Sequence, residues 1–251
     1  MRRESATLAG KTAIVTGAAK RIGGAIALAL SADGVNVVVH YHSSRGEAET
    51  LAAEIGGHGA KAWTLAADLG DAAEADRFFL RACELAGPVD ILVNSASVFP
   101  RQTLGDMTAA DLASSVQVNA WAPLVIARAL AGQGRPGAIV NLLDTRIVHG
   151  DRVHAAYHLS KRMLFTLTRM MAIEYAPRIR VNAVAPGLIL PPPGEDESYL
   201  QKMASSNPLQ KVGEVTDVTE AVLFLLRSEF VTGQVVFVDG GFHLKGSVYG
   251  L

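Results

Sequence analysis

Cysteine is almost absent from this chain, in which Cys83 is the only one. A single cysteine cannot form an internal disulfide or a cysteine-based zinc site, and it is typical of a reducing compartment. The chain also lacks any uninterrupted apolar run of about 18 residues, the length that a transmembrane helix requires. Arg2 and Arg3 are not followed by an apolar stretch, because Glu4 and Lys11 interrupt it. We therefore expect no signal peptide and a cytoplasmic location.

An excess of charge of one sign is missing too. The 251 residues include 23 Lys and Arg against 24 Asp and Glu, which gives a net charge of −1. Such a balance offers no electrostatic footprint for nucleic acid or an acidic membrane, so we expect a small-molecule partner. Hydrophobic residues make up 49% of the chain, enough for a substantial core in one large domain or two small ones.

The chain does have a regular alternation of short apolar runs and amphipathic segments. The expected strands are Thr12–Thr16, Val35–His40, Lys61–Ala66, Asp90–Val93, Gly137–Leu143, Arg180–Val184 and Gln234–Val238. The expected helices are Arg21–Asp33, Arg45–Ile55, Asp71–Ala86, Thr108–Leu130, His154–Tyr175 and Val215–Arg227. This order predicts βαβ units, and so an α/β fold with a doubly wound parallel sheet of the Rossmann type.

No linker, repeat or low-complexity block divides the chain, so we expect a single domain over residues 1–251. One irregular stretch interrupts the alternation at Pro191–Ser198, which begins with three prolines. Three successive prolines cannot continue a helix or a central strand. We interpret this stretch as the start of a surface lid near residues 188–212.

A turn with two glycines follows the first expected strand. Gly17 and Gly23 flank Arg21 at the point where the first helix should begin. Glycines at such a turn let the backbone approach a pyrophosphate, whose negative charge the helix N-terminus favours. The spacing is G-x-x-x-x-x-G rather than G-x-G-x-x-G, so an ordinary turn of an α/β protein is the alternative.

The end of the second strand lacks the carboxylate that an NAD site usually carries there. The segment His40–Arg45 offers histidines, hydroxyls and an arginine instead, and Lys20 adds a further cation. These groups favour a 2′-phosphate and therefore NADPH, whereas the alternative is a polar loop with incidental histidines. Asp68 follows the third strand and would accept a hydrogen bond from the adenine amine or cap a helix.

A tyrosine and a lysine are spaced by one helical turn in the segment His154–Tyr175. Because residues i and i+4 share a helix face, Lys161 should lie close to Tyr157. A nearby cation lowers the pKa of a phenol from its reference near ~10, which makes the tyrosine a usable proton donor.

These motifs resemble the short-chain dehydrogenase/reductases, in the order Thr16–Gly23, Asn94–Ser97, Asn119, Tyr157 with Lys161, and Pro186-Gly187. Within that family the chain most resembles the pteridine reductases and the bacterial dihydromonapterin (dihydrofolate-type) reductases, through Thr16–Gly23, His40–Ser43, Ser97 with Phe99, and Asp144. The resemblance implies NADPH as the cofactor and a homotetramer. The chain departs from the family pattern at Ser95, where the family usually has an asparagine, and at Ser43, where the pteridine reductases usually have an arginine.

The pattern and the resemblance together imply three sets of site residues. The catalytic set is Asp144, Tyr157, Lys161 and Asn119, and the resemblance places Asn119 on a water chain behind Lys161. The cofactor set is Gly17, Lys20, Arg21, Ile22, Gly23, His40, Tyr41, His42, Ser43, Asp68, Leu69, Asn94, Ser95, Ala96, Tyr157, Lys161, Pro186 and Gly187. The substrate set is Arg21, Ser97, Phe99, Asp144 and Tyr157.

Asp144 stands where most of these enzymes carry a serine. A serine hydroxyl donates to a carbonyl oxygen, whereas an ionised aspartate donates nothing but can relay a proton or hold an N–H. Asp144 with Tyr157 therefore suits a cyclic C=N bond, whose nitrogen must gain a proton as hydride reaches carbon. Phe99 would stack on a flat heteroaromatic ring. The alternatives are a turn-capping Asp144 and an ordinary core Phe99.

Three functions follow from these residues. The favoured one is an NADPH-dependent reductase of a pterin or dihydrofolate-like C=N bond. The second is a carbonyl reductase of the same family that acts on a 3-oxoacyl thioester or another ketone or alcohol, and the third is a non-catalytic nucleotide-sensing protein. No metal is expected, because His154 and His158 share a helix face without an evident third ligand.

Overall fold

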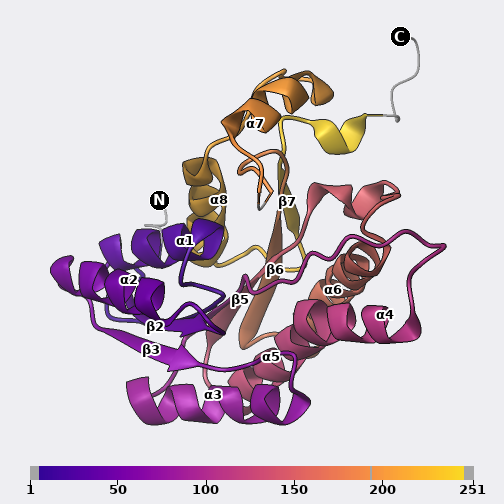
Figure 1. The fold of residues 1–251 in the computed structure, drawn as a ribbon. Coiled ribbons are helices and arrows are strands. Elements are labelled where there is room, and N and C mark those ends of the chain that lie inside the picture. The colour runs from indigo at the N-terminus through magenta and orange to yellow at the C-terminus, as the bar shows by residue number, and fades with distance from the viewer. Residues whose placement is uncertain (1–5, 193, 246–251) are drawn as a thin grey trace.

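The computed structural model describes residues 6–192 and 194–245 and contains one parallel sheet in the order β3-β2-β1-β4-β5-β6-β7 (Figure 1). The strands are β1 (Thr12–Thr16), β2 (Asn36–Tyr41), β3 (Ala62–Ala66), β4 (Ile91–Asn94), β5 (Gly137–Leu142), β6 (Ile179–Pro186) and β7 (Val235–Val238). The predicted doubly wound α/β fold is confirmed, and the strands lie within a few residues of their expected bounds.

Helices cover both faces of the sheet. The longer ones are α1 (Arg21–Ala32), α2 (Arg45–Gly57), α3 (Ala72–Ala86), α4 (Ala109–Val116), α5 (Ala122–Gly132), α6 (Ala155–Glu174), α7 (Glu197–Met203) and α8 (Val215–Arg227). Helix α1 packs beside α2 and α8 on one face, while α3 packs on α5 and α4 packs on α6 on the other. Within the described part of the chain, no helix is long and apolar enough to cross a membrane.

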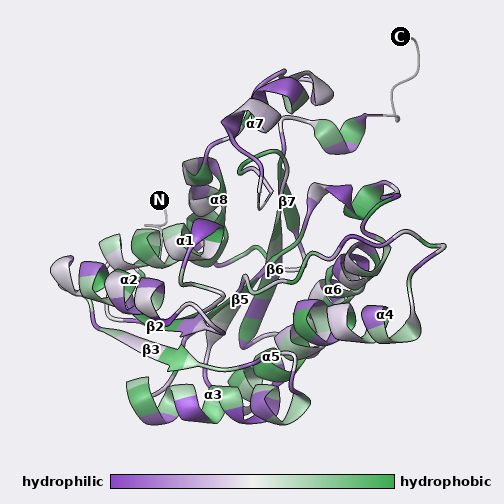
Figure 2. Ribbon diagram, in the orientation of Figure 1, coloured by the Kyte–Doolittle hydropathy of each residue, from purple (hydrophilic) through white to green (hydrophobic). Residues whose placement is uncertain are grey.

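The core lies on both sides of the sheet because successive strand residues point to opposite faces. In β1, Ala13 and Val15 join the cluster under α1 and α8, whereas Ile14 joins the cluster under α3 and α5. Figure 2 shows the hydrophobic residues along β5, β6 and β7 in green. This burial on two faces explains why the strand sequences are apolar nearly throughout.

The single helix predicted at Thr108–Leu130 is interrupted. A π-helical turn, η1 (Gln117–Trp121), separates α4 from α5 and contains Asn119. Such a turn inserts one residue into the helix, and π turns are frequent at functional sites. The structure therefore places Asn119 on an irregular turn rather than on a continuous helix.

The strand order reverses between β1 and β4, which leaves a crevice at the carboxyl ends of these strands, where ligands of open α/β sheets bind. The segment after β6 stands beyond these ends and carries α7 and the short turn η3 (Ala204–Ser206) (Figure 1). Of the irregular stretch Pro191–Ser198, Pro193 lies outside the described residues.

Candidate active site

A cavity of about 850 Å³ opens at the carboxyl ends of the strands. It lies between the turn after β1, the loops after β4 and β5, and the start of α6. The predicted site residues that line it are Gly17, Lys20, Arg21, Ile22, Gly23, His40, Tyr41, His42, Ser43, Asp68, Leu69, Ser95, Ala96, Ser97, Phe99, Asp144, Tyr157, Lys161, Pro186 and Gly187. Asn94 and Asn119 are buried and do not line the cavity, so they can support it only from behind.

The turn after β1 needs its first glycine for two reasons. Gly17 has a φ of +63°, and a Cβ there would lie 2.8 Å from Ala96 Cα. Arg21 also has a positive φ, +57°, which costs a non-glycine residue about 1–2 kcal/mol. The Arg21 guanidinium donates to the Pro191 carbonyl oxygen at 2.7 Å and so joins this turn to the segment after β6.

His40 lines the cavity, but the prediction that it offers a cation to a phosphate is wrong. Its ring is buried, where Nδ1 accepts from the Gly17 N–H at 2.9 Å and Nε2 lies 3.1 Å from the Ala67 carbonyl oxygen. Burial lowers the pKa of His40 to about 4, against which the hydrogen bond to Ala67 acts only in part. A neutral His40 therefore fixes the glycine turn.

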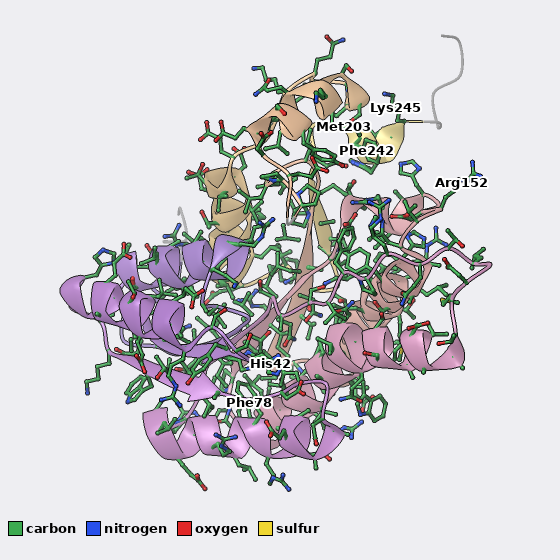
Figure 3. All side chains as sticks on the ribbon, viewed as in Figure 1. His42, Phe78, Arg152, Met203, Phe242 and Lys245 are labelled. Atoms are coloured by element: carbon green, nitrogen blue, oxygen red, sulfur yellow. The ribbon has the colours of Figure 1, made fainter. Side chains whose placement is uncertain are left out.

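The exposed basic side chains around the turn after β2 are His42, Arg45 and Lys20. Figure 3 shows His42 near the carboxyl end of β2. Each has a carboxylate nearby at the surface, such as Asp68, which lies 3.9 Å from His42 Nε2. Asp71, not Asp68, caps α3. The Oδ1 atom of Asp68 accepts instead from the Gly70 N–H at 2.8 Å.

The end of β4 is held by a threonine from the neighbouring strand. Thr16 Oγ1 accepts from the N–H groups of Ser95 and Ala96, each at 3.0 Å. Asn94 donates instead to Asn141 Oδ1 in the interior, at 2.8 Å. With a serine at position 95, the backbone N–H groups at the end of β4 therefore still have hydrogen-bond partners.

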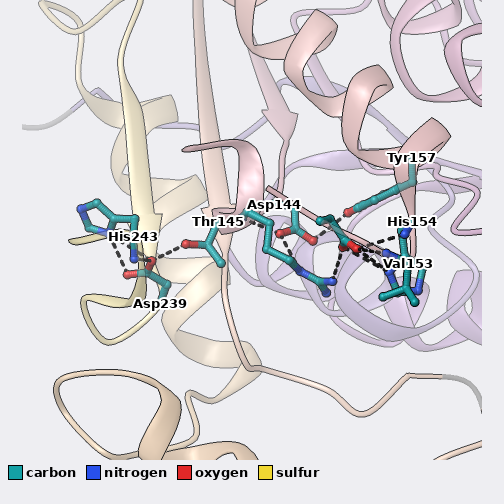
Figure 4. A network of polar contacts seen from close by, with 9 residues as sticks. Asp144, Thr145, Val153, His154, Tyr157, Asp239 and His243 are labelled. Atoms are coloured by element: carbon teal, nitrogen blue, oxygen red, sulfur yellow. Dashed lines mark hydrogen bonds and ion pairs between the residues drawn. The ribbon is translucent and has the colours of Figure 1, made fainter. Parts of the chain in front are cut away.

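Tyr157 and Asp144 form the central pair of the site. The Tyr157 hydroxyl donates to Asp144 Oδ2 at 2.9 Å, and Asp144 Oδ1 accepts from the Arg146 N–H at 2.7 Å (Figure 4). Asp144 thus caps the short turn η2 (Thr145–Val148) and also contacts the tyrosine. The turn cap considered for Asp144 is therefore present, together with a contact that brings its carboxylate to the tyrosine hydroxyl.

The predicted effect of Lys161 on the tyrosine is wrong. Burial and the Asp144 carboxylate raise the pKa of Tyr157 well above its usual value. Lys161 donates from Nζ to the Leu142 carbonyl oxygen at 2.7 Å, and Nζ lies 5.8 Å from the Tyr157 ring centroid. Burial lowers the pKa of Lys161 to about 8, opposed by Asp144. The hydroxyl of Tyr157 therefore stays protonated at neutral pH.

Asn119 joins the loop after β4 to α6. Its Oδ1 accepts from the Val98 N–H at 2.9 Å, and its Nδ2 donates to Ser160 Oγ at 2.9 Å. Ser160 precedes Lys161, and its hydroxyl donates to the Tyr157 carbonyl oxygen at 2.6 Å. Asn119 thus fixes the turn of α6 that carries both Tyr157 and Lys161.

Three residues that the sequence analysis did not assign to the site lie at its substrate end, where Arg146 lines the cavity and Asp151 and His154 stand behind it. Arg146 Nη1 donates to Asp151 Oδ2 at 2.7 Å, and His154 Nδ1 lies 3.1 Å from the same oxygen. The His154 ring stacks on Phe99 with centroids 4.0 Å apart, and Phe99 meets Tyr157 edge to face at 4.5 Å. One face of Phe99 is therefore already covered by a side chain.

A second polar group ties the C-terminal segment to the loop after β5. Thr145 donates to Asp239, whose carboxylate also accepts from the His243 N–H at 2.8 Å (Figure 4). His149 Nε2 lies 3.3 Å from the Phe242 carbonyl oxygen. These contacts fix the residue next to Asp144. Among residues 6–192 and 194–245, no group of three His, Cys, Asp or Glu side chains could hold a metal ion.

Comparisons with known proteins agree with this geometry. A family model described as "Enoyl-(Acyl carrier protein) reductase" matches residues 17–243. L-xylulose reductase from Bos taurus is 38% identical over 246 residues, which cover 94% of this chain and 97% of that protein.

Two solved structures extend the comparison. FolM alternative dihydrofolate reductase 1 from Brucella canis, complexed with NADP, is 31% identical, with a TM-score of 0.90 over 98% of this chain and 97% of that one. The angucycline C-6 ketoreductase LanV with bound NADP is 28% identical, with a TM-score of 0.87 over 97% and 100% of the two chains. The similar proteins therefore include both a dihydrofolate reductase and reductases of ketones.

Proposed function

The chain belongs to the short-chain dehydrogenase/reductase family, and from that premise we propose that it is an NADPH-dependent reductase of a pterin or dihydrofolate-like C=N bond. The observation that carries the proposal is the 2.9 Å hydrogen bond from the Tyr157 hydroxyl to the Asp144 carboxylate inside the cavity. The Asp144 carboxylate can only accept hydrogen bonds. A carbonyl oxygen of a substrate would need a second donor beside the Tyr157 hydroxyl, and a carboxylate does not provide one. FolM, a dihydrofolate reductase by name, shares the fold and the extent of this chain.

The residues present fit NADPH. Gly17 lines the cavity without a side chain, and the N-terminus of α1 carries no side-chain cap, so its N–H groups can receive a pyrophosphate. Lys20, His42 and Arg45 would hold a 2′-phosphate, and Lys161 would hold the nicotinamide ribose. When bound, NADPH supplies the hydride.

Proton delivery falls to Tyr157. Its hydroxyl carries the proton that the substrate nitrogen must gain, although burial and Asp144 raise its pKa and so oppose the release of that proton. Asp144 orients that hydroxyl and offers its own oxygens to a substrate N–H, while Asn119 holds the helix turn in place. Phe99 lines the cavity beside the tyrosine, with His154 stacked behind it, and its ring suits a planar substrate.

The segment 188–212 is proposed as a lid over this cavity. Ile189, Leu190 and Pro192 line the cavity, and the Arg21 guanidinium holds the Pro191 carbonyl oxygen. A segment tied to the cofactor turn can respond to cofactor binding and shield the substrate from water.

A carbonyl reductase is the second candidate. L-xylulose reductase and the angucycline ketoreductase match the chain over nearly their whole length, which favours it. The same fold could also carry a non-catalytic nucleotide sensor, but the combination of Tyr157, Lys161 and Asn119 in one site argues for chemistry.

One substitution separates the two enzymatic candidates. Asp144→Ser removes the carboxylate and restores a hydroxyl donor. If the substrate is a pterin, the variant should reduce dihydrobiopterin at least about 10-fold more slowly, since one acid–base partner contributes about 10²–10⁴. Its affinity for NADPH should not change, which titration checks.

NADPH oxidation is followed with dihydrobiopterin, dihydrofolate and an acetoacetyl thioester in parallel, for the wild type and the variant. Wild-type turnover of the thioester alone, without binding of either reduced pterin, would assign the chain to the carbonyl reductases. NADPH binding without turnover of any of the three would favour the nucleotide sensor.

A further inference from the structure

We infer that Arg146 is a substrate-binding residue that selects a neutral hydrogen-bond acceptor, such as a ring oxo group, next to the reacting bond. The inference rests on the proposed function, since it names which part of a pterin-like ring the site recognises. It concerns a residue outside the tyrosine, lysine and asparagine of the catalytic set. Its evidence is the way in which the chain holds one guanidinium at the edge of the cavity.

Arg146 lines the cavity beside the catalytic pair. Its side chain is 37% exposed, while those of Asp144 and Asp151 are 16% and 3% exposed. Arg146 Nε lies 3.5 Å from Asp144 Oδ1 and Nη1 lies 2.7 Å from Asp151 Oδ2. Among the described residues Nη2 has no hydrogen-bond or ion-pair partner, so this edge is available to a ligand.

Asp151 is the anchor of the arrangement. One of its oxygens accepts from the N–H groups of Val153 and His154, at 2.8 and 3.0 Å, and the other receives Arg146 (Figure 4). A buried carboxylate with this many donors cannot move easily. Asp151 therefore acts as a positioning residue, which fixes Arg146 without touching the substrate.

The neighbouring aromatic wall limits what can reach this guanidinium. Arg146 Cζ lies 5.5 Å from the Phe99 ring centroid, and Phe99 is backed by His154 and meets the Tyr157 ring. A flat ring that lies along this wall would bring its edge toward both Arg146 and the Tyr157 hydroxyl. An acceptor near the bond that gains the proton is thus within the reach of the guanidinium.

The local charges favour a neutral acceptor over an anion. Arg146 already faces the two carboxylates of Asp144 and Asp151, so its positive charge is already compensated. A carboxylate or phosphate of the substrate would be repelled by both aspartates, whereas a ring oxygen would only accept a hydrogen bond. The open edge of the guanidinium therefore favours an oxo group over an amino group, because an amino group would bring donors to a donor.

The test compares two ligands that differ at one group. Pterin, which has a ring oxo group, and its analogue with an amino group in that place are titrated into the enzyme saturated with NADP⁺. Arg146→Met keeps the aliphatic stem and removes the donors. It should weaken pterin binding by about 10-fold or more, the scale of a hydrogen bond from a charged group, and change the affinity for the analogue by less than about 2-fold.

Two further variants and one control sharpen the result. Arg146→Lys should restore part of the preference for pterin, because a cationic donor remains. Asp151→Asn should reduce the preference without removing any group that touches the ligand. Arg152 is exposed and lies on the outer edge of the molecule (Figure 3), so Arg152→Met should behave like the wild type. Equal loss of both ligands in Arg146→Met would overturn the inference.

A failure of the proposed function gives a different result. If the wild type binds neither pteridine, the pterin assignment falls, and the inference is decided by reduction of a cyclic vicinal dione and of the ketone that lacks its second oxygen. A selective rise of KM for the dione in Arg146→Met supports the role of Arg146. An equal change for both ketones, or a wild type that reduces neither, overturns it.

Discussion

His40 links the shape of the nucleotide site to the response of the protein to acid. Its ring accepts from the Gly17 N–H and is buried, and its pKa is about 4. An unfolded chain binds the same proton with a pKa near ~6.5. Between these two values the unfolded state holds more protons, so stability falls as the pH falls through this window.

The resulting prediction concerns His40→Gln. A glutamine amide can still accept from Gly17 and donate to Ala67, but it does not titrate. The wild-type free energy of unfolding should drop between about pH 7 and pH 5 by about 2 kcal/mol more than that of the variant. Urea denaturation at both pH values measures this difference. Parallel pH dependence in the two proteins would show that His40 is not the buried acid-sensitive group.

A second prediction concerns the hydroxyl of Tyr157. Tyr157→Phe keeps the ring that meets Phe99 but removes the proton donor and its hydrogen bond to Asp144. Turnover should fall by about 10²-fold or more, the usual scale for a general acid, with little change in NADPH affinity. Steady-state kinetics and an NADPH titration check both parts. A phenylalanine variant with the wild-type rate would move proton delivery to another group.

For single residues, sequence spacing predicts contacts within one helix better than contacts between loops. Tyr157 and Lys161 share a face of α6 as the spacing requires. Asp151 reaches Arg146 only because the loop before α6 folds back on η2, and no local pattern encodes that return. The pKa shift of Tyr157 was missed for the same reason, since burial and Asp144 decide it.

The turn between β2 and α2 is where we expect NADPH to be distinguished from NADH. Arg45 begins α2, and its side chain and those of Lys20 and His42 are 73%, 60% and 68% exposed. NADPH should therefore bind at least about 10-fold more tightly than NADH, because a phosphate contact to a charged group is worth about 1.5–3 kcal/mol. Arg45→Met should reduce this ratio and leave NADH affinity unchanged. Fluorescence titration that gave equal dissociation constants for the two nucleotides would contradict the prediction.

Whole elements follow from the sequence where local patterns decide them. The strand Thr12–Thr16 has its predicted bounds, since a buried strand shows as an apolar run before a glycine turn. The π turn at Gln117–Trp121 was not predictable, because tertiary bonds from Asn119 to Val98 and Ser160 accompany it. Helix α7, within the expected lid segment 188–212, is absent from the predicted helices, although Asp196 caps it with a hydrogen bond from the Ser198 N–H at 2.8 Å.

The surface of the whole molecule carries apolar residues that the core does not use. Several apolar residues of the long helices are nevertheless buried within this chain, namely Ala120, Val125, Ala127, Leu164 and Met171. Others remain outside: Leu159, Met170 and Ile173 lie on one face of α6 by their spacing and are 41%, 59% and 81% exposed. Trp121 adds to this exposed set.

This distribution leads to the last prediction, which concerns assembly. An exposed apolar stripe along α6 is stabilised when a second copy covers it, and closed symmetry then gives a dimer. Phe224 and Phe230, exposed on and just after α8, offer a second surface, so a dimer of dimers is expected. Light scattering should give two or four times the chain mass of 26.4 kDa.

Two variants test whether the α6 stripe is the contact surface. Ile173→Glu places a charge in the stripe and should lower the measured mass. Leu80→Glu on α3 is the control, since Leu80 is 64% exposed but distant in sequence from the stripe. A wild-type monomer at micromolar concentration would show that the stripe stays open to solvent, and an equal effect of both variants would mean that any added charge weakens assembly.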